Sequence, residues 1–130
     1  MAKRLNCILL IDDDDGDNEY HRFVIDKMNI TENVRVAENG IEALDFLKRE
    51  NEIRPDLIFL DINMPKMNGW EFLDEYKHLN TAEKHIIIVM LTTSANPADV
   101  EKAQKIAAVK GFETKPLTPE MLTKILTEHF

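Results

Sequence analysis

The chain has 130 residues, 44% hydrophobic and 31% charged, so it is long enough for one folded domain and too short for two. Sixteen basic and twenty-four acidic residues give a formal charge of −8, which argues against non-specific binding to nucleic acid or anionic membranes. A lone cysteine, Cys7, excludes an internal disulfide framework and fits a reducing cytoplasm. The apolar run near Met1 is too short for a signal peptide or a spanning helix. We therefore expect a cytoplasmic protein with a single domain over residues 1–130.

Apolar runs and turn signals predict the elements of the first half of the chain. Four aspartates follow the first apolar run, and Gly16 offers a bend before residues with helical spacing, which include Tyr20, Phe23, Val24 and Met28. The predicted elements are a strand over Leu5–Ile11, a helix over about 16–29, an edge strand over Val34–Ala37, a helix from Ile41 to about Glu50, and a strand over Leu57–Leu60. The last of these is continuously apolar, as expected of a strand buried on both faces of a parallel sheet.

The second half repeats this pattern. Asn96-Pro97 and Thr118-Pro119 each combine a helix N-cap with proline at the first helical position. The predicted elements are a helix after Asn68-Gly69 with Phe72, Leu73, Tyr76 and Leu79 on its inner face, a strand over His85–Leu91, a helix from Pro97 to about Ala108, a strand over Gly111–Thr114, and a last helix that reaches Phe130. Five strands alternating with five helices predict an α/β fold with right-handed crossovers and a parallel sheet. The flavodoxin-like doubly wound strand order 2-1-3-4-5 suits this count.

Polar residues gather where the predicted strands end. Asp12 and Asp13 follow the first strand, Asp61 the third, Thr92 the fourth and Lys115 the fifth. In the order 2-1-3-4-5 the first and third strands are neighbours, so their carboxylates meet at the switch point of the sheet. Crowded carboxylates call for a hard divalent cation, and Mg²⁺ needs only two of them plus a further oxygen. The backbone carbonyl of Asn63 is the candidate for that further ligand.

These groups suit phosphoryl transfer. A carboxylate beside a metal ion can attack phosphorus and form an acyl phosphate. Lys115 would then offset charge on the transferring oxygens, and Thr92 could donate a hydrogen bond to one of them.

Five features together resemble the response-regulator receiver domain, the phosphoacceptor half of two-component signalling. They are Ile8-Leu9-Leu10-Ile11-Asp12-Asp13, Leu60-Asp61-Ile62-Asn63-Met64-Pro65 followed by Gly69, Leu91-Thr92, Phe112, and Lys115-Pro116. They occur in the order and spacing of the family and span essentially the whole chain. A lone Asp-Asp pair is weak evidence, but the five together are highly specific.

The resemblance implies that a histidine kinase or a histidine phosphotransfer protein phosphorylates Asp61 with Mg²⁺ bound. It further implies that Asp13 binds the metal directly and Asp12 largely through water, and that Thr92 and Lys115 contact the phosphoryl group. By the same resemblance Phe112 is the switch aromatic, and the Lys115-Pro116 bond is cis. We expect no attached effector domain, so output would be made by contact with a downstream protein through the face formed by the fourth helix, the fifth strand and the fifth helix.

The chain departs from the family pattern at three places. Ala108-Val109 stands where receivers often have Gly-Ala, so the end of the fourth helix is expected to differ. The switch aromatic is phenylalanine rather than tyrosine and has no hydroxyl. Thr93-Ser94 occupies positions that influence the lifetime of the phosphoryl group.

Other interpretations compete with a receiver. Asp13-Asp14-Asp15-Gly16 echoes the Asp-x-Asp loop of haloacid-dehalogenase-like phosphatases, in which Asp13 would be the nucleophile. A flavodoxin-like cofactor binder shares the fold, but the acidic first loop would repel a flavin phosphate. A receiver-shaped protein could also signal without phosphate. His21, His78, His85 and His129 show no metal-ligand spacing and are expected at the surface or the edge of the core, and an EF-hand fails because Ile11 would be its first ligand.

Overall fold

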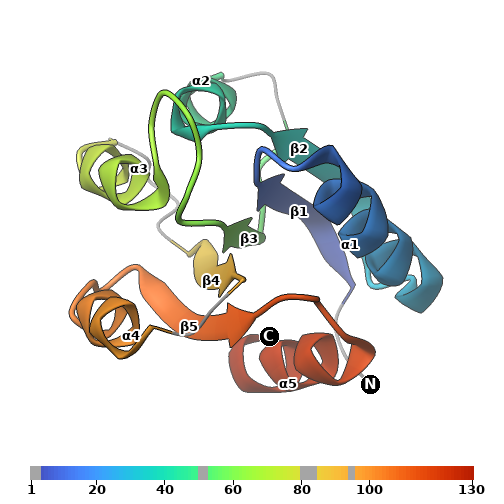
Figure 1. The fold of residues 1–130 in the computed structure, drawn as a ribbon. Helices are drawn as coiled ribbons and strands as arrows, with labels where there is room; N and C mark the ends of the chain where they lie inside the picture. The colour runs from blue at the N-terminus through green and yellow to red at the C-terminus, as the bar shows by residue number, and fades with distance from the viewer. Residues whose placement is uncertain (1–3, 50–52, 80–84, 94–95) are drawn as a thin grey trace.

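A computed structural model describes residues 4–49, 53–79, 85–93 and 96–130. In these residues five strands and five helices alternate along the chain (Figure 1). They are β1 (Leu5–Ile11), α1 (Asp15–Met28), β2 (Thr31–Ala37), α2 (Gly40–Lys48), β3 (Leu57–Leu60), α3 (Gly69–Tyr76), β4 (Ile87–Thr92), α4 (Pro97–Gln104), β5 (Val109–Thr114) and α5 (Pro119–His129). The strands form one parallel sheet in the order β2-β1-β3-β4-β5, which confirms the predicted fold class.

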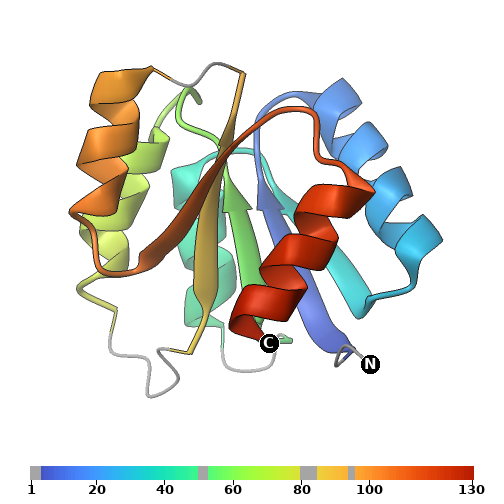
Figure 2. The same cartoon turned by 90° about the horizontal axis from the view of Figure 1, so that it is seen from below.

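The core lies on both faces of the sheet, because successive side chains of a strand point to opposite sides. On one face Leu9, Ile58 and Ile88 pack with buried residues of α2, α3 and α4. On the other face Phe59 and Val89 pack with buried residues of α1 and α5. Figures 1 and 2 show these three helices on one side of the sheet and the other two on the opposite side. Continuous apolar strands are therefore explained by burial on both faces.

Side-chain caps begin all five helices of the described chain. The expected caps at Asn96 and Thr118 are present, with each side chain accepting a hydrogen bond from a backbone N–H of the first turn. Asp14 caps α1 and Asn39 caps α2 in the same way. Asn68 and Glu71 form a reciprocal capping box at α3. Such caps fix where each helix begins, and so where the preceding loop can lie.

Several predicted bounds were wrong. The fourth helix ends at Gln104 rather than near Ala108, because the next four residues turn back to start β5, and Ile106 and Ala108 pack against the core. The edge strand β2 begins at Thr31 rather than Val34, because its pairing with β1 extends through polar residues. Strands β4 and β5 begin two residues away from the predicted positions, and α3 ends at Tyr76. The predicted end of the second helix at Glu50 lies outside the described residues.

The apolar residues whose spacing predicted α1 do not all face the core. Tyr20 and Phe23 are 49% and 58% exposed, whereas Asn18, His21 and Ile25 face inward with Val24. His21 is therefore buried, contrary to its expected place at the surface or core edge, and burial lowers the pKa of its imidazole. The buried side of α1 thus includes two polar residues, Asn18 and His21, which the spacing of apolar residues does not indicate.

The pairing of β4 with β5 contains one irregularity. Ile88 lies opposite Val109 while Val89 lies opposite Gly111, so Lys110 is an extra residue in β5. This is the arrangement of a β-bulge, and Lys110 is exposed there. Among the described residues, no helix has the length and apolar character needed to cross a bilayer.

Candidate functional site

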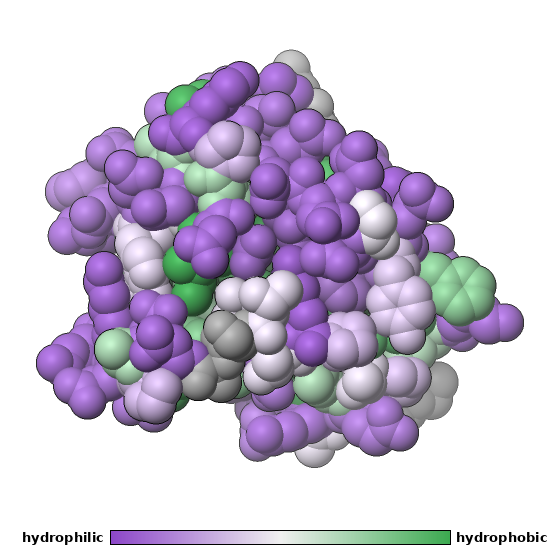
Figure 3. All heavy atoms as spheres, viewed as in Figure 1, coloured by the Kyte–Doolittle hydropathy of each residue, from purple (hydrophilic) through white to green (hydrophobic). Residues whose placement is uncertain are grey.

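The predicted polar residues meet at the carboxyl edge of the sheet. Leu60 of β3 pairs with Ile11 of β1, and the N–H of Asp61 donates to the Ile11 carbonyl at 2.9 Å. Asp12 and Asp61 therefore leave neighbouring strands side by side, and both are buried together with Thr92 at the end of β4. Figure 3, seen from the same side as Figure 1, shows hydrophilic residues gathered over the end of β1 and the start of α1.

Three of these carboxylates can hold a metal ion. One oxygen each from Asp12, Asp13 and Asp61 lies within 4.8 Å of the others. Asp12 is buried, whereas Asp13 is exposed, so an ion held here would keep contact with water on one side. An all-oxygen donor set of this kind fits a hard divalent cation. Asn63 is exposed in the loop after β3, and the role of its carbonyl as a further ligand stays a prediction.

Asp61 is held in one orientation by the backbone. The N–H of Ile62 donates to Asp61 Oδ1 at 2.9 Å, which leaves Oδ2 on the side of Lys115. The pKa of Asp61 is raised from 3.8 to about 6, first by burial and then by the nearby Asp12 carboxylate, against the opposing effect of Lys115. A carboxylate with a raised pKa is a stronger base and nucleophile than an ordinary aspartate.

Lys115 is the only described cation within ion-pair distance of these acids. Its Nζ lies 2.6 Å from Asp12 Oδ2, 2.8 Å from Asp17 Oδ2 and 3.5 Å from Asp61 Oδ2. Burial alone would lower the pKa of Lys115, but hydrogen bonds to Asp12 and Asp17 and the charges of the acids outweigh burial and raise it. The Lys115 N–H donates to the Thr92 carbonyl at 2.7 Å, and the Lys115-Pro116 bond is cis, as the resemblance implied.

Two residues of α1 join this site although they were not predicted in it. The Asp17 carboxylate pairs with Lys115, and Asn18 Nδ2 donates to the Asp12 carbonyl at 2.9 Å. The Oδ1 of Asn18 is buried with no hydrogen-bond partner in the described chain. A helix that starts after the Asp14 cap returns to the same side after about one turn. Its periodicity could therefore have predicted that Asp17, four residues after Asp13, lies near the acidic site.

The loop after Asp61 is anchored at two points. The Gly69 N–H donates to the Ile62 carbonyl at 2.8 Å, and the Gly40 N–H donates to the Met67 carbonyl at 3.1 Å. A Cβ on Gly69 would lie 2.5 Å from the Asp61 carbonyl oxygen, so only glycine fits here without a shift of the backbone. The start of α3 therefore packs directly under the residue that the sequence marks as the phosphoacceptor.

Thr92 and Phe112 lie where the sequence places the switch pair. Thr92 is buried at the end of β4, and Phe112 of β5 pairs with Met90 and packs, half-buried, against the core. Their roles as hydrogen-bond donor and switch stay predictions. Ser94, one of the two residues expected to influence the phosphoryl lifetime, lies outside the described residues.

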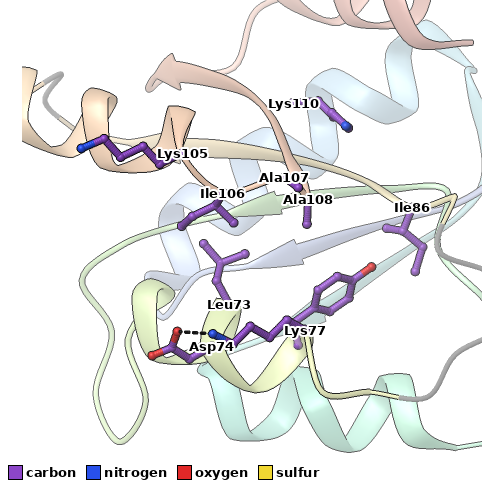
Figure 4. A pocket seen from close by; sticks show the side chains of 10 residues that line it. Leu73, Asp74, Lys77, Ile86, Lys105, Ile106, Ala107, Ala108 and Lys110 are labelled. Carbon is purple, nitrogen blue, oxygen red and sulfur yellow. Dashed lines mark ion pairs between the residues drawn. The ribbon is translucent and has the colours of Figure 1, made fainter.

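A separate cavity of about 500 Å³ lies near the opposite edge of the sheet. Its lining includes Leu73 and Tyr76 of α3, Ile86 before β4, and Ile106 and Ala108 between α4 and β5. Figure 4 shows Lys77 paired with Asp74, while Lys105 and Lys110 extend away from each other at its rim. Its polar groups do not converge, unlike those of the acidic site.

Comparisons with known proteins agree on one family. The family described as the response regulator receiver domain matches residues 8–127. Response regulator Rcp1 of Synechocystis sp. is 39% identical over 97 residues, which cover 72% of this chain and 65% of that protein. A crystal structure of a two-component response regulator from Cytophaga hutchinsonii superposes with a TM-score of 0.90 at 31% identity, covering 97% of both chains. The Mn²⁺-bound form of Rcp1 superposes with a TM-score of 0.75 at 32% identity, covering 95% of this chain and 90% of that chain.

The match to curated relatives is partial on their side. The aligned region spans less than two thirds of Rcp1 and between 14% and 54% of several other relatives. The likeness therefore concerns the part of those proteins that has this fold.

Proposed function

This chain belongs to the response regulator receiver family, and on that premise we propose that Asp61 accepts a phosphoryl group and thereby switches a protein-binding surface. One observation carries the proposal: Asp61 is a buried carboxylate with a raised pKa, placed between two further aspartates and a buried lysine ammonium. Receiver domains partner histidine kinases, so the donor is a phosphohistidine of a sensor kinase or of a phosphotransfer protein.

We propose Mg²⁺ as the ion, held by Asp12, Asp13 and Asp61 with the Asn63 carbonyl. The all-oxygen donor set supports this choice, because Mg²⁺ binds through a few carboxylates and keeps several waters. When bound, Mg²⁺ offsets negative charge on the phosphoryl oxygens. It would also reduce repulsion among the three carboxylates, two of which, Asp12 and Asp61, already lie close to the Lys115 ammonium.

The residues of the chain account for the transfer itself. A carboxylate oxygen of Asp61 attacks phosphorus, the P–N bond to the donor imidazole breaks, and the imidazole leaves with a proton from solvent. The Ile62 N–H orients the Asp61 carboxylate during this step. Lys115 offsets charge on one transferring oxygen, and the Thr92 hydroxyl donates a hydrogen bond to another.

Phosphorylation by a small donor tests this proposal directly. Purified protein mixed with Mg²⁺ and acetyl phosphate is expected to gain one phosphoryl group per chain in intact-mass spectrometry. Asp61→Asn should gain none, because an amide is a poor nucleophile, while Asp45→Asn, an exposed site on α2, should behave as wild type. Phosphorylation of Asp61→Asn to the wild-type extent would overturn the proposal.

The aspartyl phosphatase alternative gives the opposite result in this assay. Its nucleophile would be Asp13, so Asp13→Asn would abolish the covalent intermediate and Asp61→Asn would leave it. Membership of the receiver family instead makes the chain a phosphoacceptor signalling domain. In a receiver, Asp13→Asn slows loading by weakening metal binding and leaves Asp61 as the modified residue.

We also propose that residues 1–130 form one domain whose output is made by contact through α4, β5 and α5. Phe112 supports this surface, since it is half-buried on β5, the strand that pairs with β4, at whose end Thr92 lies. Beryllofluoride, a stable mimic of the phosphoryl group, should shift backbone NMR signals of these three elements more than those of α2. Larger shifts in α2 than in α4 and β5 would count against this surface.

A further inference from the structure

The ammonium of Lys115 is shared among three carboxylates, and one of them has no place in the proposed chemistry. Asp12 and Asp61 belong to the cluster that can hold a metal ion, whereas Asp17 lies on α1 outside that cluster. Nevertheless Asp17 Oδ2 is 2.8 Å from Lys115 Nζ, closer than Asp61 Oδ2 at 3.5 Å. The lysine that should serve Asp61 is thus drawn toward α1.

The donors of Lys115 are limited. An ammonium group can donate three hydrogen bonds, and two of its short contacts go to Asp12 and Asp17. The side chain of Lys115 is 8% exposed, so it has little freedom to seek other partners. A phosphoryl group on Asp61 also adds negative charge to a site that already holds several carboxylates. The third N–H remains for the Asp61 side, but Nζ is held 3.5 Å from Asp61 Oδ2 while it is 2.8 Å from Asp17 Oδ2. A movement of the ammonium toward a phosphoryl oxygen on Asp61 therefore works against its contact with Asp17.

Asp17 is the partner that Lys115 can release at the lower free-energy cost. Its side chain is 37% exposed, so water can solvate the carboxylate once Lys115 moves, whereas the Asp12 side chain is 7% exposed. The start of α1 does not depend on the Asp17 carboxylate, because Asp14 caps the helix by accepting from the Asp17 backbone N–H. The Asp17 carboxylate therefore serves to bind Lys115 and is not needed to cap the helix.

We propose that Asp17 is a positioning residue that competes with the phosphoryl group for Lys115. In the unphosphorylated protein it holds the ammonium toward α1, and in the phosphorylated protein Lys115 exchanges Asp17 for a phosphoryl oxygen. The ion pair thereby weakens the phosphorylated state, and its exchange releases α1 from the loop between β5 and α5. This inference rests on the proposed function of Asp61 and adds a residue that tunes it.

Beryllofluoride affinity at saturating Mg²⁺ measures the competition. Asp17→Asn removes the competing charge and keeps the size of the side chain, so it should bind beryllofluoride about threefold to tenfold more tightly than wild type. Asp17→Glu keeps the charge and should remain within about twofold of wild type. Asp15→Asn removes a charge from the same turn of α1 without a described contact to Lys115, and should also change affinity by less than about twofold.

A spectroscopic signal separates this role from a structural one. The ¹³Cε and ¹⁵Nζ resonances of Lys115 should move when wild-type protein binds beryllofluoride. In metal-free Asp17→Asn they should already lie part of the way toward the bound position. A general loosening of α1 would not shift them in that direction. If Asp17→Asn is poorly folded, Asp17→Ser serves as the second neutral variant with the same expectation.

The outcomes divide cleanly. Unchanged or weaker beryllofluoride binding by a folded, neutral Asp17 variant would overturn the inference, and so would an equal gain in Asp15→Asn. If wild-type protein binds no beryllofluoride at all, the proposed function of Asp61 fails instead. Tighter binding confined to neutral variants at Asp17, with the shifted Lys115 resonances, supports the competition.

Discussion

The carboxyl group of Asp61 is both buried and close to another carboxylate. Burial is the larger cause of its raised pKa of about 6, and Asp12 adds to it. The ionised form is therefore less favourable in the folded chain than in the unfolded chain, where the pKa is near 3.8. At neutral pH the metal-free fold carries this residue at a loss of stability, as is common for reactive groups.

Replacing Asp61 should reveal that loss. Because the folded pKa lies above the unfolded one, the penalty is absent below about pH 4, grows as the pH rises to 6, and is complete above it. In the presence of a chelator, Asp61→Asn should raise the free energy of unfolding by about 2 kcal/mol at pH 7.5. Below pH 4 the two proteins should be equal. Urea denaturation at both pH values measures the difference, and Asp45→Asn is the control. A loss of stability at pH 7.5 would refute the assignment.

At the scale of residues, the sequence predicted those members of the site that lie at the ends of strands. Asp12, Asp61 and Thr92 end successive strands of the sheet, so the parallel topology alone brings them together. Asp17 was missed because it lies on a helix, where an acid in the first turn is already explained by the helix dipole. Its contact with Lys115 joins residues 98 positions apart and depends on packing that no local pattern encodes.

At the scale of elements, the loop from β3 to α3 has little room for a larger side chain at Gly69. Gly69 begins α3, and its N–H reaches back to Ile62. A methyl group here would collide with the backbone of Asp61, which cannot yield as a flexible side chain would. The helix and the acceptor residue are thus positioned by one close approach.

Gly69→Ala should therefore disturb both stability and function. The backbone must shift to admit the Cβ, which should lower the free energy of unfolding by about 1–3 kcal/mol. The same shift moves Asp61, so beryllofluoride should bind more weakly. Gly111→Ala is the matched control, because its Cβ would lie 3.5 Å from a Val89 methyl group, an ordinary contact. Equal effects of the two variants in urea denaturation would contradict this reasoning.

Element bounds were predicted less well than element types. The residues between α4 and β5 are good helix formers, so the sequence does not indicate where α4 ends. The chain turns at Ile106 because this residue packs against the core. Strand β2 gained three polar residues because its partner β1 supplies hydrogen bonds regardless of side chain. These are choices of tertiary structure, which local propensity does not contain.

At the scale of the whole molecule, the acidic site couples metal binding to folding. An ion that binds the folded chain at Asp12, Asp13 and Asp61 finds no assembled site in the unfolded chain. Stability should then rise with the concentration of free metal.

Alternation of strands and helices was sufficient to predict this fold, since it permits few sheet topologies.

Mg²⁺ should stabilise the protein measurably. At a free concentration 100 times its dissociation constant, the free energy of unfolding should rise by about 2.7 kcal/mol, and a chelator should reverse the gain. Asp13→Asn should lose most of it because a ligand is missing, whereas Asp45→Asn should keep it. Thermal denaturation over a Mg²⁺ series measures the effect. Equal stabilisation of wild type and Asp13→Asn would place the ion elsewhere.

The extra residue in β5 has a consequence for the protein at high concentration. Strand β5 is the last strand of the sheet, and an outer strand exposes backbone groups to which a second chain could add. The bulge at Lys110 interrupts the regular spacing of those groups, and the exposed Lys110 places a positive charge there. Addition of a strand from a second molecule is therefore opposed at this edge of the sheet.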